Sequence, residues 1–258
     1  MCNEKAFRSK LSIEMLHIIA PSNRRLVWYL AMEEYFAKRV EEDIFFTWVV
    51  SPTVIFGRHQ VMEAEVNMAY CREHNIAIYR RKSGGGCVYA DEGNLMMSLI
   101  SPSTHSEQVF QAFLDRITHV LCDLGFAATK SGHNDIMVDG YKVSGNACYA
   151  LPTGTIVHGT MLVNVDFDAL QQAITPSMEK LAKHGVQSVR QRVANLSTLT
   201  TTSKHLTPHK FTIHHPSQIA TILHDALCTS SRELTTEEIM EIDRIEQSYL
   251  EPAFIAGK

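Results

Sequence analysis

The chain has 258 residues, of which 45% are hydrophobic, and a formal net charge of −4. This length supports a large buried core in one or two domains, and the acidic balance gives no indication of nucleic-acid binding, so an anion site would have to be local. The six cysteines form no CxxC pair, and neither a signal peptide nor an apolar run of about 18 residues is present, so we expect reduced thiols, a cytoplasmic location and no membrane partner.

The first half of the chain alternates between helical and extended patterns. Apolar residues recur every three or four positions in the predicted helices, and β-branched and aromatic residues fill the predicted strands. The predicted helices are Leu26 to Val40, Glu65 to His74 and Ser106 to Leu124. The predicted strands are Ile44 to Val50, Thr53 to Gly57 and Ile76 to Arg81.

The segment Arg80 to Asn94, RRKSGGGCVYADEGN, is the most informative part of the chain. Gly84 to Gly86 have no Cβ, so their backbone N–H groups can turn toward a bound anion, while Arg80 and Arg81 supply positive charge beside them. This combination predicts a site for phosphate or carboxylate. Taken alone, three glycines and two arginines are also typical of a hairpin turn with surface charges.

Two further blocks predict strands that carry polar residues. The block Asn134 to Ala147, NDIMVDGYKVSGNA, reads as a hairpin with an Asp139-Gly140 turn and Lys142 on its second strand. Turn and alternation together fix the direction of the Lys142 side chain. The block Val157 to Asn164 predicts another strand, which starts near His158, Gly159 and Thr160.

The C-terminal part adds helices and one polar loop. The predicted helices are Asp166 to Ile174, Pro216 to Leu227 and Thr235 to Leu250, the last opening with a capping pattern. Ser197 to Lys210, rich in Ser, Thr, His and Lys, predicts an exposed loop. Strands in hairpin order with helices laid against them favour an α+β domain around a mainly antiparallel sheet.

In this order and spacing the blocks resemble the lipoate-protein ligase family, and so does the run Ser177 to Leu196. The resemblance extends from about Trp28 to Leu250. It implies a biotin/lipoate-protein ligase-like catalytic domain, and we expect residues 1–258 to form one such domain. In many family members the segment that resembles Tyr249 to Gly257 leads into a small accessory domain, which we expect this chain to lack.

The resemblance implies an ATP-dependent lipoate-protein ligase. A carboxylic acid is inert toward amines, so the family joins lipoate to the α-phosphate of ATP and then transfers the acyl group to a lysine of an acceptor lipoyl domain. Both steps build negative charge near one point, where a single fixed cation can serve both. Lys142 matches the family's catalytic lysine, although strand lysines in general face solvent.

The family's binding residues carry over onto matching positions. Nucleotide contacts are implied for Arg81, Gly86, Cys87, Val88, Tyr89, Asn134, Asp135 and Lys142. Lipoate contacts are implied for Arg80, Ser83, Gly84, Gly85, Lys142, Gly145, His158, Gly159 and Thr160. His158 reads equally as a core histidine. Mg²⁺ is expected with ATP, and Asp135 is its candidate contact or an exposed hairpin residue.

The implied partners are the lipoyl domains of 2-oxoacid dehydrogenase complexes and the H protein of glycine cleavage. Where the family usually has His, Asn and Ser, this chain has Ala90, Met96 or Met97, and Asn146, and these departures bear on substrate preference.

Two alternatives stay open. One is an ATP-independent octanoyl or lipoyl transferase that works through a cysteine thioester, for which Cys148 is the candidate nucleophile. The other is a subunit that uses lipoyl adenylate and needs a separate accessory protein for activation. Biotin ligation is a more distant reading, because biotin ligases carry a differently built glycine-rich loop.

Overall fold

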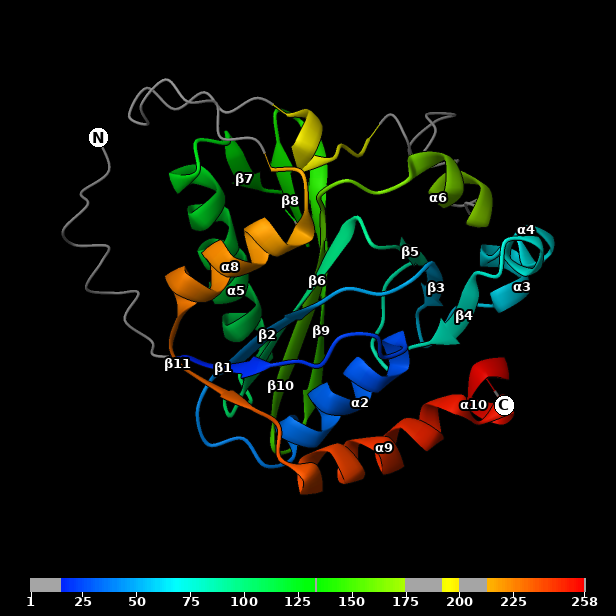
Figure 1. Ribbon diagram of the computed structural model, residues 1–258, viewed down its shortest axis with the longest axis horizontal. Helices are drawn as coiled ribbons and strands as arrows, with labels where there is room; N and C mark the ends of the chain where they lie inside the picture. The colour runs from blue at the N-terminus through cyan, green and yellow to red at the C-terminus, as the bar shows by residue number, and fades with distance from the viewer. Residues whose placement is uncertain (1–14, 133, 175–191, 200–212, 258) are drawn as a thin grey trace.

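The computed structural model describes residues 15–132, 134–174, 192–199 and 213–257. Within these ranges the strands form two sheets, and helices cover both faces of the larger one (Figure 1). The strands are β1 (Met15–Ile19), β2 (Ile44–Trp48), β3 (Thr53–Phe56), β4 (Ala77–Arg80), β5 (Val88–Ala90), β6 (Asn94–Ser101), β7 (Ala128–Lys130), β8 (Asp135–Val138), β9 (Tyr141–Leu151), β10 (Gly154–Leu162) and β11 (Cys228–Glu233). The helices are α2 (Leu26–Ala37), α3 (Met62–Glu65), α4 (Met68–Glu73), α5 (Ser106–Asp123), α6 (Phe167–Ala173), the 3-10 helix η2 (Leu196–Thr198), α8 (Pro216–Leu227), α9 (Thr236–Leu250) and α10 (Pro252–Ala256).

The larger sheet has eight strands in the order β11-β1-β2-β6-β10-β9-β8-β7. Only β1 makes parallel pairs, with β11 on one side and β2 on the other, and the remaining neighbours are antiparallel. The smaller sheet has the order β4-β3-β5, with β3 parallel to β4 and antiparallel to β5. The predicted α+β class with a mainly antiparallel sheet is confirmed.

The central strands bury both of their faces because their side chains alternate between two cores. Ile44 and Ile100, which pair directly across β2 and β6, lie in the core under α2, whereas the next pair, Phe45 and Leu99, packs toward α5 and α8. The strand β10 continues both patterns, with Ile156 on the α2 side. This alternation determines which residues can reach a site on the α2 side.

The smaller sheet has a core of its own. Val54, Phe56 and Tyr89 on its strands pack with Cys71 of α4 and Leu170 of α6. Figure 1 shows α3, α4 and α6 grouped beside β3, β4 and β5, at one end of the larger sheet. The glycine-rich segment between β4 and β5 therefore lies where the two sheets meet.

The helix α9, which precedes the short C-terminal helix α10, covers α2 on the outside (Figure 1). The indole N–H of Trp28 donates to Asp243 Oδ1 at 2.7 Å, and the Tyr249 hydroxyl donates to Glu34 Oε2 at 3.2 Å. The predicted capping of this helix is confirmed, since Thr235 Oγ1 accepts from the backbone of Glu238 while the Glu238 carboxylate accepts from the backbone of Thr235.

Some predicted elements differ in detail. Of the expected helix from Glu65 to His74, only α4 is helical as a separate element, and Glu65 ends the short helix α3, because Val66 is extended and Asn67 caps α4. The polar strand β11 went unpredicted, because an edge strand that pairs on one side only needs no apolar alternation. The predicted loop Ser197 to Lys210 lies outside the described residues from position 200 onward, and the run Ser177 to Leu196 lies outside them up to position 191. Of the helices described, none combines the length and apolar content needed to cross a bilayer.

Two histidines stack between β1 and α8. The rings of His17 and His224 have centroids 3.7 Å apart, and Thr47 Oγ1 lies 3.0 Å from His224 Nε2. Burial lowers the pKa of His224 to about 4, with a smaller contribution from His17, whose own pKa burial also lowers.

These shifts predict acid sensitivity of the fold. A folded-state pKa below the unfolded value of about 6.5 means that the unfolded chain binds more protons between pH 6.5 and 4, so stability falls as the pH falls through this window. The His224→Gln variant has no imidazole to protonate at this position. We therefore expect its urea midpoint to decline less between pH 7 and 4.5 than the midpoint of the native chain, whatever the midpoint of the variant is at pH 7. The exposed His59→Gln control should keep the native slope. Identical slopes for all three would contradict this assignment.

Candidate functional site

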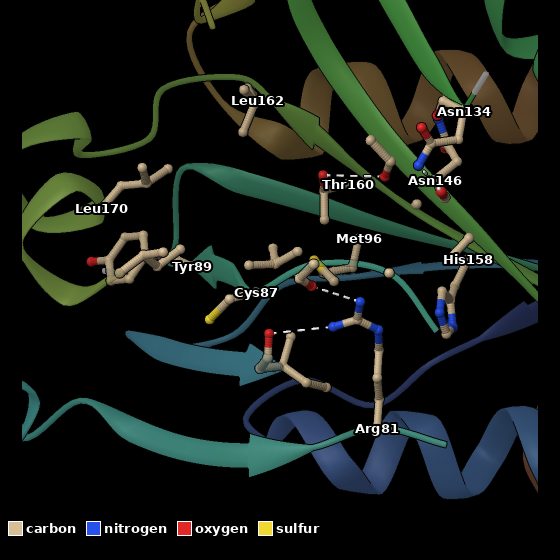
Figure 2. Close-up of a pocket in the computed structure, with 18 of the residues that line it drawn as sticks. Arg81, Cys87, Tyr89, Met96, Asn134, Asn146, His158, Thr160, Leu162 and Leu170 are labelled. Atoms are coloured by element: carbon tan, nitrogen blue, oxygen red, sulfur yellow. Dashed lines mark hydrogen bonds between the residues drawn. The ribbon is translucent and has the colours of Figure 1, made fainter. Parts of the chain in front are cut away.

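A cavity of about 360 Å³ lies on the α2 side of the larger sheet, next to the smaller sheet (Figure 2). Its wall is largely apolar and is interrupted by a few charged and amide side chains. The apolar lining residues include Leu26, Leu30, Trp48, Ile55, Val88, Tyr89, Met96, Leu162 and Leu170. The polar ones include Arg81, Asn134, Lys142, Asn146, His158, Thr160 and Arg192. Such a wall suits a ligand with an apolar chain and an anionic head.

Arg81 shapes the glycine-rich segment from inside. Its guanidinium donates to the carbonyls of Gly84 (2.7 Å), Gly86 (2.7 Å) and Ile55 (3.3 Å), two of which are drawn in Figure 2. Burial lowers the pKa of Arg81 to about 10, so the group stays charged at neutral pH. Among the described ion pairs none joins Arg81 to a carboxylate, so its charge remains available to attract an anion into the cavity.

The glycines of this segment are required by close packing. Gly85 has φ +91°, which an L side chain rarely adopts, and a Cβ there would meet the Arg81 guanidinium at 3.0 Å. A Cβ on Gly57 at the end of β3 would overlap the carbonyl of Gly85. The loop conformation thus depends on bare backbone at both positions.

A β-bulge turns Lys142 into the cavity. Ile136 pairs with Ser144 but Met137 pairs with Lys142, so β9 holds one extra residue, Val143, at this point. One extra residue reverses the alternation: Val143 packs in the core toward α5, and Lys142 reaches the opposite face. There its Nζ lies 2.7 Å from the point where a Cβ on Gly145 would be, closer than such a Cβ would allow.

Lys142 is held by its neighbours on two sides. Its Nζ forms an ion pair with Asp135 Oδ1 at 2.8 Å, and its backbone N–H donates to the carbonyl of Arg192 at 2.9 Å. Asn134 and Asn146 connect β9 to the residue that precedes β8. The side-chain amide of Asn134 donates to the backbone carbonyl of Asn146 at 2.8 Å, and the side-chain amide of Asn146 donates to the backbone carbonyl of Asn134 at 3.0 Å. The lysine is therefore placed by backbone geometry and remains about one third exposed toward the cavity.

His158 occupies the α2 end of the same wall. Its Nε2 lies 2.9 Å from Ser83 Oγ, and its Nδ1 lies 3.0 Å from Glu33 Oε2. The histidine is thus both a lining residue and part of a hydrogen-bonded chain that runs into the core.

Most of the residues singled out in the sequence come together here. Those that line the cavity are Arg81, Gly85, Gly86, Cys87, Val88, Tyr89, Asn134, Lys142, Gly145, His158, Gly159 and Thr160. Ser83, Gly84 and Asp135 lie immediately behind them, in contact with His158, Arg81 and Lys142 respectively.

Arg80 is not brought to the cavity wall. Its guanidinium donates to the carbonyls of Arg58 (2.6 Å), Gln60 (3.0 Å) and Ile255 (3.0 Å), so it fastens α10 to the smaller sheet. The two adjacent arginines therefore have different tasks, because successive side chains of a strand point to opposite faces.

Sequence reasoning did not find several lining residues. Leu26, Leu30, Trp48 and Met96 read as ordinary core positions, and only the fold shows that they border a cavity. Arg192 lies in the run Ser177 to Leu196, whose resemblance to the family is the one feature of the sequence that indicates a functional role for this residue. Among the described cysteines Cys87 lines the cavity, while Cys148 packs toward α5, where burial raises its thiol pKa to about 11.

Comparison with known proteins settles the family. The profile of the lipoyl protein ligase A/B catalytic domain matches residues 27–214. The chain belongs to this family. Lipoate–protein ligase 1 of Staphylococcus aureus is 42% identical over 170 residues, which are 65% of this chain and 52% of that protein. Lipoate-protein ligase LplJ of Bacillus subtilis is 39% identical over 171 residues, with the same coverage. The chain thus spans about half the length of the curated relatives it matches.

Solved structures share the fold of this lipoyl ligase family member. The bi-partite lipoate protein ligase of Thermoplasma acidophilum, described with its E2 lipoyl domain, has a TM-score of 0.77 and 24% identity, and the match covers 95% of this chain and 96% of that one. A lipoate-protein ligase A bound with ATP has a TM-score of 0.75 and 21% identity, covering 95% and 99%. These similarities support the confirmed fold class.

The position of Lys142 in this lipoyl ligase family member can be tested through Gly145. A Cβ at position 145 would displace the lysine ammonium, which can move because its stem is flexible, so the Gly145→Ala variant should stay folded. We expect the acyl-transfer activity proposed below to be roughly 10- to 100-fold lower, since a misplacement of about 1 Å costs that much.

The matched control is Gly132→Ala, where a Cβ meets nothing within 4 Å. Activity would be measured as acyl transfer to an acceptor domain, and folding by thermal denaturation. Full activity in Gly145→Ala would contradict a role for the observed lysine position.

Proposed function

We propose that this chain is the catalytic part of an ATP-dependent lipoate-protein ligase that forms lipoyl-AMP and transfers the lipoyl group to a lysine of acceptor lipoyl domains. The observation that carries the proposal is the placement of the Lys142 ammonium and the Arg81-supported glycine segment on one cavity wall. The curated names of the relatives support it. We further propose that residues 1–258 act as one catalytic domain.

The two ends of the cavity suit the two substrates. Leu26, Leu30 and Trp48 form an apolar end that suits the acyl chain, with His158 beside it. Tyr89 and Leu170 lie together at the opposite end (Figure 2), which we assign to the nucleotide base. The substrate carboxylate and the α-phosphate would then meet near Lys142 and Arg81.

Lys142 can stabilise both steps. In the first, a carboxylate oxygen attacks the α-phosphorus and pyrophosphate leaves, while negative charge grows on the phosphoryl oxygens. In the second, the acceptor amine attacks the acyl carbon and AMP leaves, while charge grows on the carbonyl oxygen. A compact ammonium between the two oxygens lowers both barriers. Asp135 holds that ammonium in place through the ion pair between them.

A Mg²⁺ ion fits this arrangement only as a companion of ATP. Among the described residues, no group of three His, Cys, Asp or Glu side chains could hold a metal ion. Mg²⁺ in nucleotide sites commonly uses one or two carboxylates together with phosphates, and Asp135 is the carboxylate beside Lys142. We propose it as the protein contact, with charge neutralisation on the phosphates as the contribution of the ion.

The proposed acceptors are lipoyl domains of 2-oxoacid dehydrogenase complexes and the glycine cleavage H protein. The structurally similar bi-partite ligase is described with an E2 lipoyl domain, which supports this class of acceptor. Its bi-partite nature also supports the second candidate, in which this chain needs a separate accessory protein for the activation step. None of the five described cysteines forms a disulfide, which supports our proposal of a reducing, cytoplasmic location.

We expect the purified chain to release pyrophosphate only when lipoate and ATP are both present, and then to lipoylate an acceptor domain. Lys142→Ala should lower both half-reactions by roughly 10²- to 10³-fold, the cost of losing one donor to the transition-state oxygens. Lys142→Arg should fail as well, because a planar fork does not replace a point donor. The control is Lys130→Ala, an exposed lysine of β7.

Three outcomes would redirect the proposal. Acyl transfer from an octanoylated carrier without ATP would favour the transferase, with Cys87 as the thiol that lines the cavity. Lipoylation from preformed lipoyl adenylate alone would favour the accessory-dependent subunit. Native activity in Lys142→Ala would contradict the proposed mechanism altogether.

A further inference from the structure

The residues on either side of Arg81 contact the two C-terminal helices. Arg80, before it, donates through Nε to the backbone carbonyl of Ile255 in α10 at 3.0 Å. Lys82, after it, places its Nζ 4.5 Å from the centre of the Tyr249 ring in α9. Arg81 itself lines the cavity and holds carbonyls of the glycine-rich segment. Three consecutive residues therefore connect α9 and α10 to the loop that forms one wall of the cavity.

The Lys82 ammonium lies in a polar cluster between α2 and α9. Its Nζ donates to Glu34 Oε2 at 2.6 Å, and the Tyr249 hydroxyl donates to the same oxygen at 3.2 Å. Glu34 and Tyr249 are both buried, so these contacts are largely shielded from water. An ammonium that faces a carboxylate and an aromatic ring is attracted by each, and more strongly where water is excluded. One charged group thus fixes the start of the loop to both helices.

Glu34 has a second cation, which allows the role of Lys82 to be separated from that of the ion pair. Lys38, one turn later on α2, donates to Glu34 Oε1 at 2.7 Å. Burial raises the pKa of Glu34, but the hydrogen bonds from Lys38 and Lys82 outweigh this and lower the pKa below its usual value. With either lysine removed the carboxylate keeps a partner, so loss of Lys82 is compatible with a folded chain. Of the two lysines, Lys82 alone belongs to the loop.

A displacement of Lys82 would reach the cavity wall through the next residues. Ser83 Oγ lies 2.9 Å from Nε2 of His158, which lines the cavity. The carbonyl of Gly84, one position further, accepts from Arg81 at 2.7 Å. The glycine-rich segment belongs to no helix or strand, so its shape depends on side-chain contacts such as these.

We propose that Lys82 and Tyr249 are positioning residues, through which α9 holds the start of the glycine-rich loop in the shape that binds the acyl adenylate. This inference rests on the proposed function, which supplies the ligand. The helices α9 and α10 lie beyond residue 214, where the match to the family profile ends, so this role goes beyond what the family match indicates.

The contact acts on affinity more than on the rate of the bound complex. A loop that is already ordered loses less freedom when a ligand binds. Once the ligand is bound, it holds the loop itself, so the same contact matters less for the chemical step.

The test uses Lys82→Met, which keeps most of the side-chain stem and removes the ammonium. Binding of lipoyl-sulfamoyl adenosine, a non-hydrolysable mimic of lipoyl adenylate, would be measured by calorimetry. We expect roughly 2- to 30-fold weaker binding, the range that a single cation–π contact spans. In ligation assays the KM for ATP should rise by a similar factor, whereas kcat at saturating substrate should stay close to the native value.

Lys38→Met is the matched control, because it removes the other ammonium from the same carboxylate without altering the loop. It should keep the native affinity and KM. Lys82→Arg should recover most of the affinity, since a guanidinium can pair with Glu34 and stack on the Tyr249 ring. Tyr249→Leu removes that ring and gives a second route if Lys82→Met fails to fold, whereas Tyr249→Phe keeps the ring and should bind as the native chain does.

A second readout needs no ligand. The Arg81 Nε–H donates to the carbonyl of Gly84 at 3.1 Å, so its exchange with solvent, followed by ¹⁵N NMR, reports the shape of the loop. We expect faster exchange in Lys82→Met and Tyr249→Leu than in the native chain and in Lys38→Met. Thermal denaturation would confirm that each variant is folded.

Native affinity together with native Arg81 exchange in Lys82→Met would overturn the inference. Equal losses in Lys82→Met and Lys38→Met would overturn it too, because they would reflect the ion pair and not the loop, and so would a lower kcat with unchanged affinity.

Failure of the proposed function has a different signature. A native chain that neither binds the adenylate mimic nor releases pyrophosphate would contradict the proposed function, while the Arg81 exchange would still test the link between the loop and α9. A chain that ligates while Lys82→Met keeps every native value would contradict only the inference.

Discussion

The site depends on one extra residue in β9. Without the bulge at Val143, strict alternation would send Lys142 toward α5, into an apolar core where an ammonium is costly to bury. With it, Lys142 reaches the cavity and Val143 fills the core position instead. The asparagine clip between Asn134 and Asn146 stands at the end of the same hairpin and holds the two strands in this register. A change in strand register is thus the physical basis of the placement of the charge.

The second cation at the cavity, Arg81, uses its hydrogen bonds to hold the protein backbone. Arg81 donates to carbonyls of the glycine-rich segment, and so these peptide groups turn their oxygens inward around the guanidinium. Its neighbour Arg80 fastens α10 in the same way, through Ile255. Together they connect the glycine-rich loop and α10 to the smaller sheet. The positive charge of Arg81 attracts an anionic ligand through its electrostatic field, without a direct hydrogen bond to that ligand.

Local patterns in the sequence predicted much of the fold. The helix that begins at Leu26, the helix from Ser106 and the hairpin around Asp139 and Gly140 all follow from apolar spacing and turn residues, and these are strong local signals. The strand β11 could not be predicted, because its polar residues are held by pairing with β1, more than 200 residues away in the sequence. The division of the helix near Val66 depends on the bridge between Val66 and Ile174, which is also a long-range contact.

The candidate site was predicted in its motifs but less well in its geometry. The glycine segment and Lys142 were identified from residue type and order, yet a plain hairpin alternation gives no sign of the bulge that turns the lysine. Arg80 and Arg81 look equivalent in the sequence, and only the pleat of β4 separates their roles. Glu33 is one of two adjacent glutamates in α2, and its contact with His158 exists only because α2 lies across β10.

The most direct measurement is a crystal structure of the chain with a non-hydrolysable acyl-sulfamoyl adenosine. The ammonium of Lys142 should lie within about 3.2 Å of both the acyl carbonyl oxygen and a sulfamoyl oxygen, with the acyl chain between Leu26 and Trp48. An adenylate bound elsewhere, or a Lys142 that remains on Asp135 with no contact to either oxygen, would contradict the shared role of this lysine in the two half-reactions.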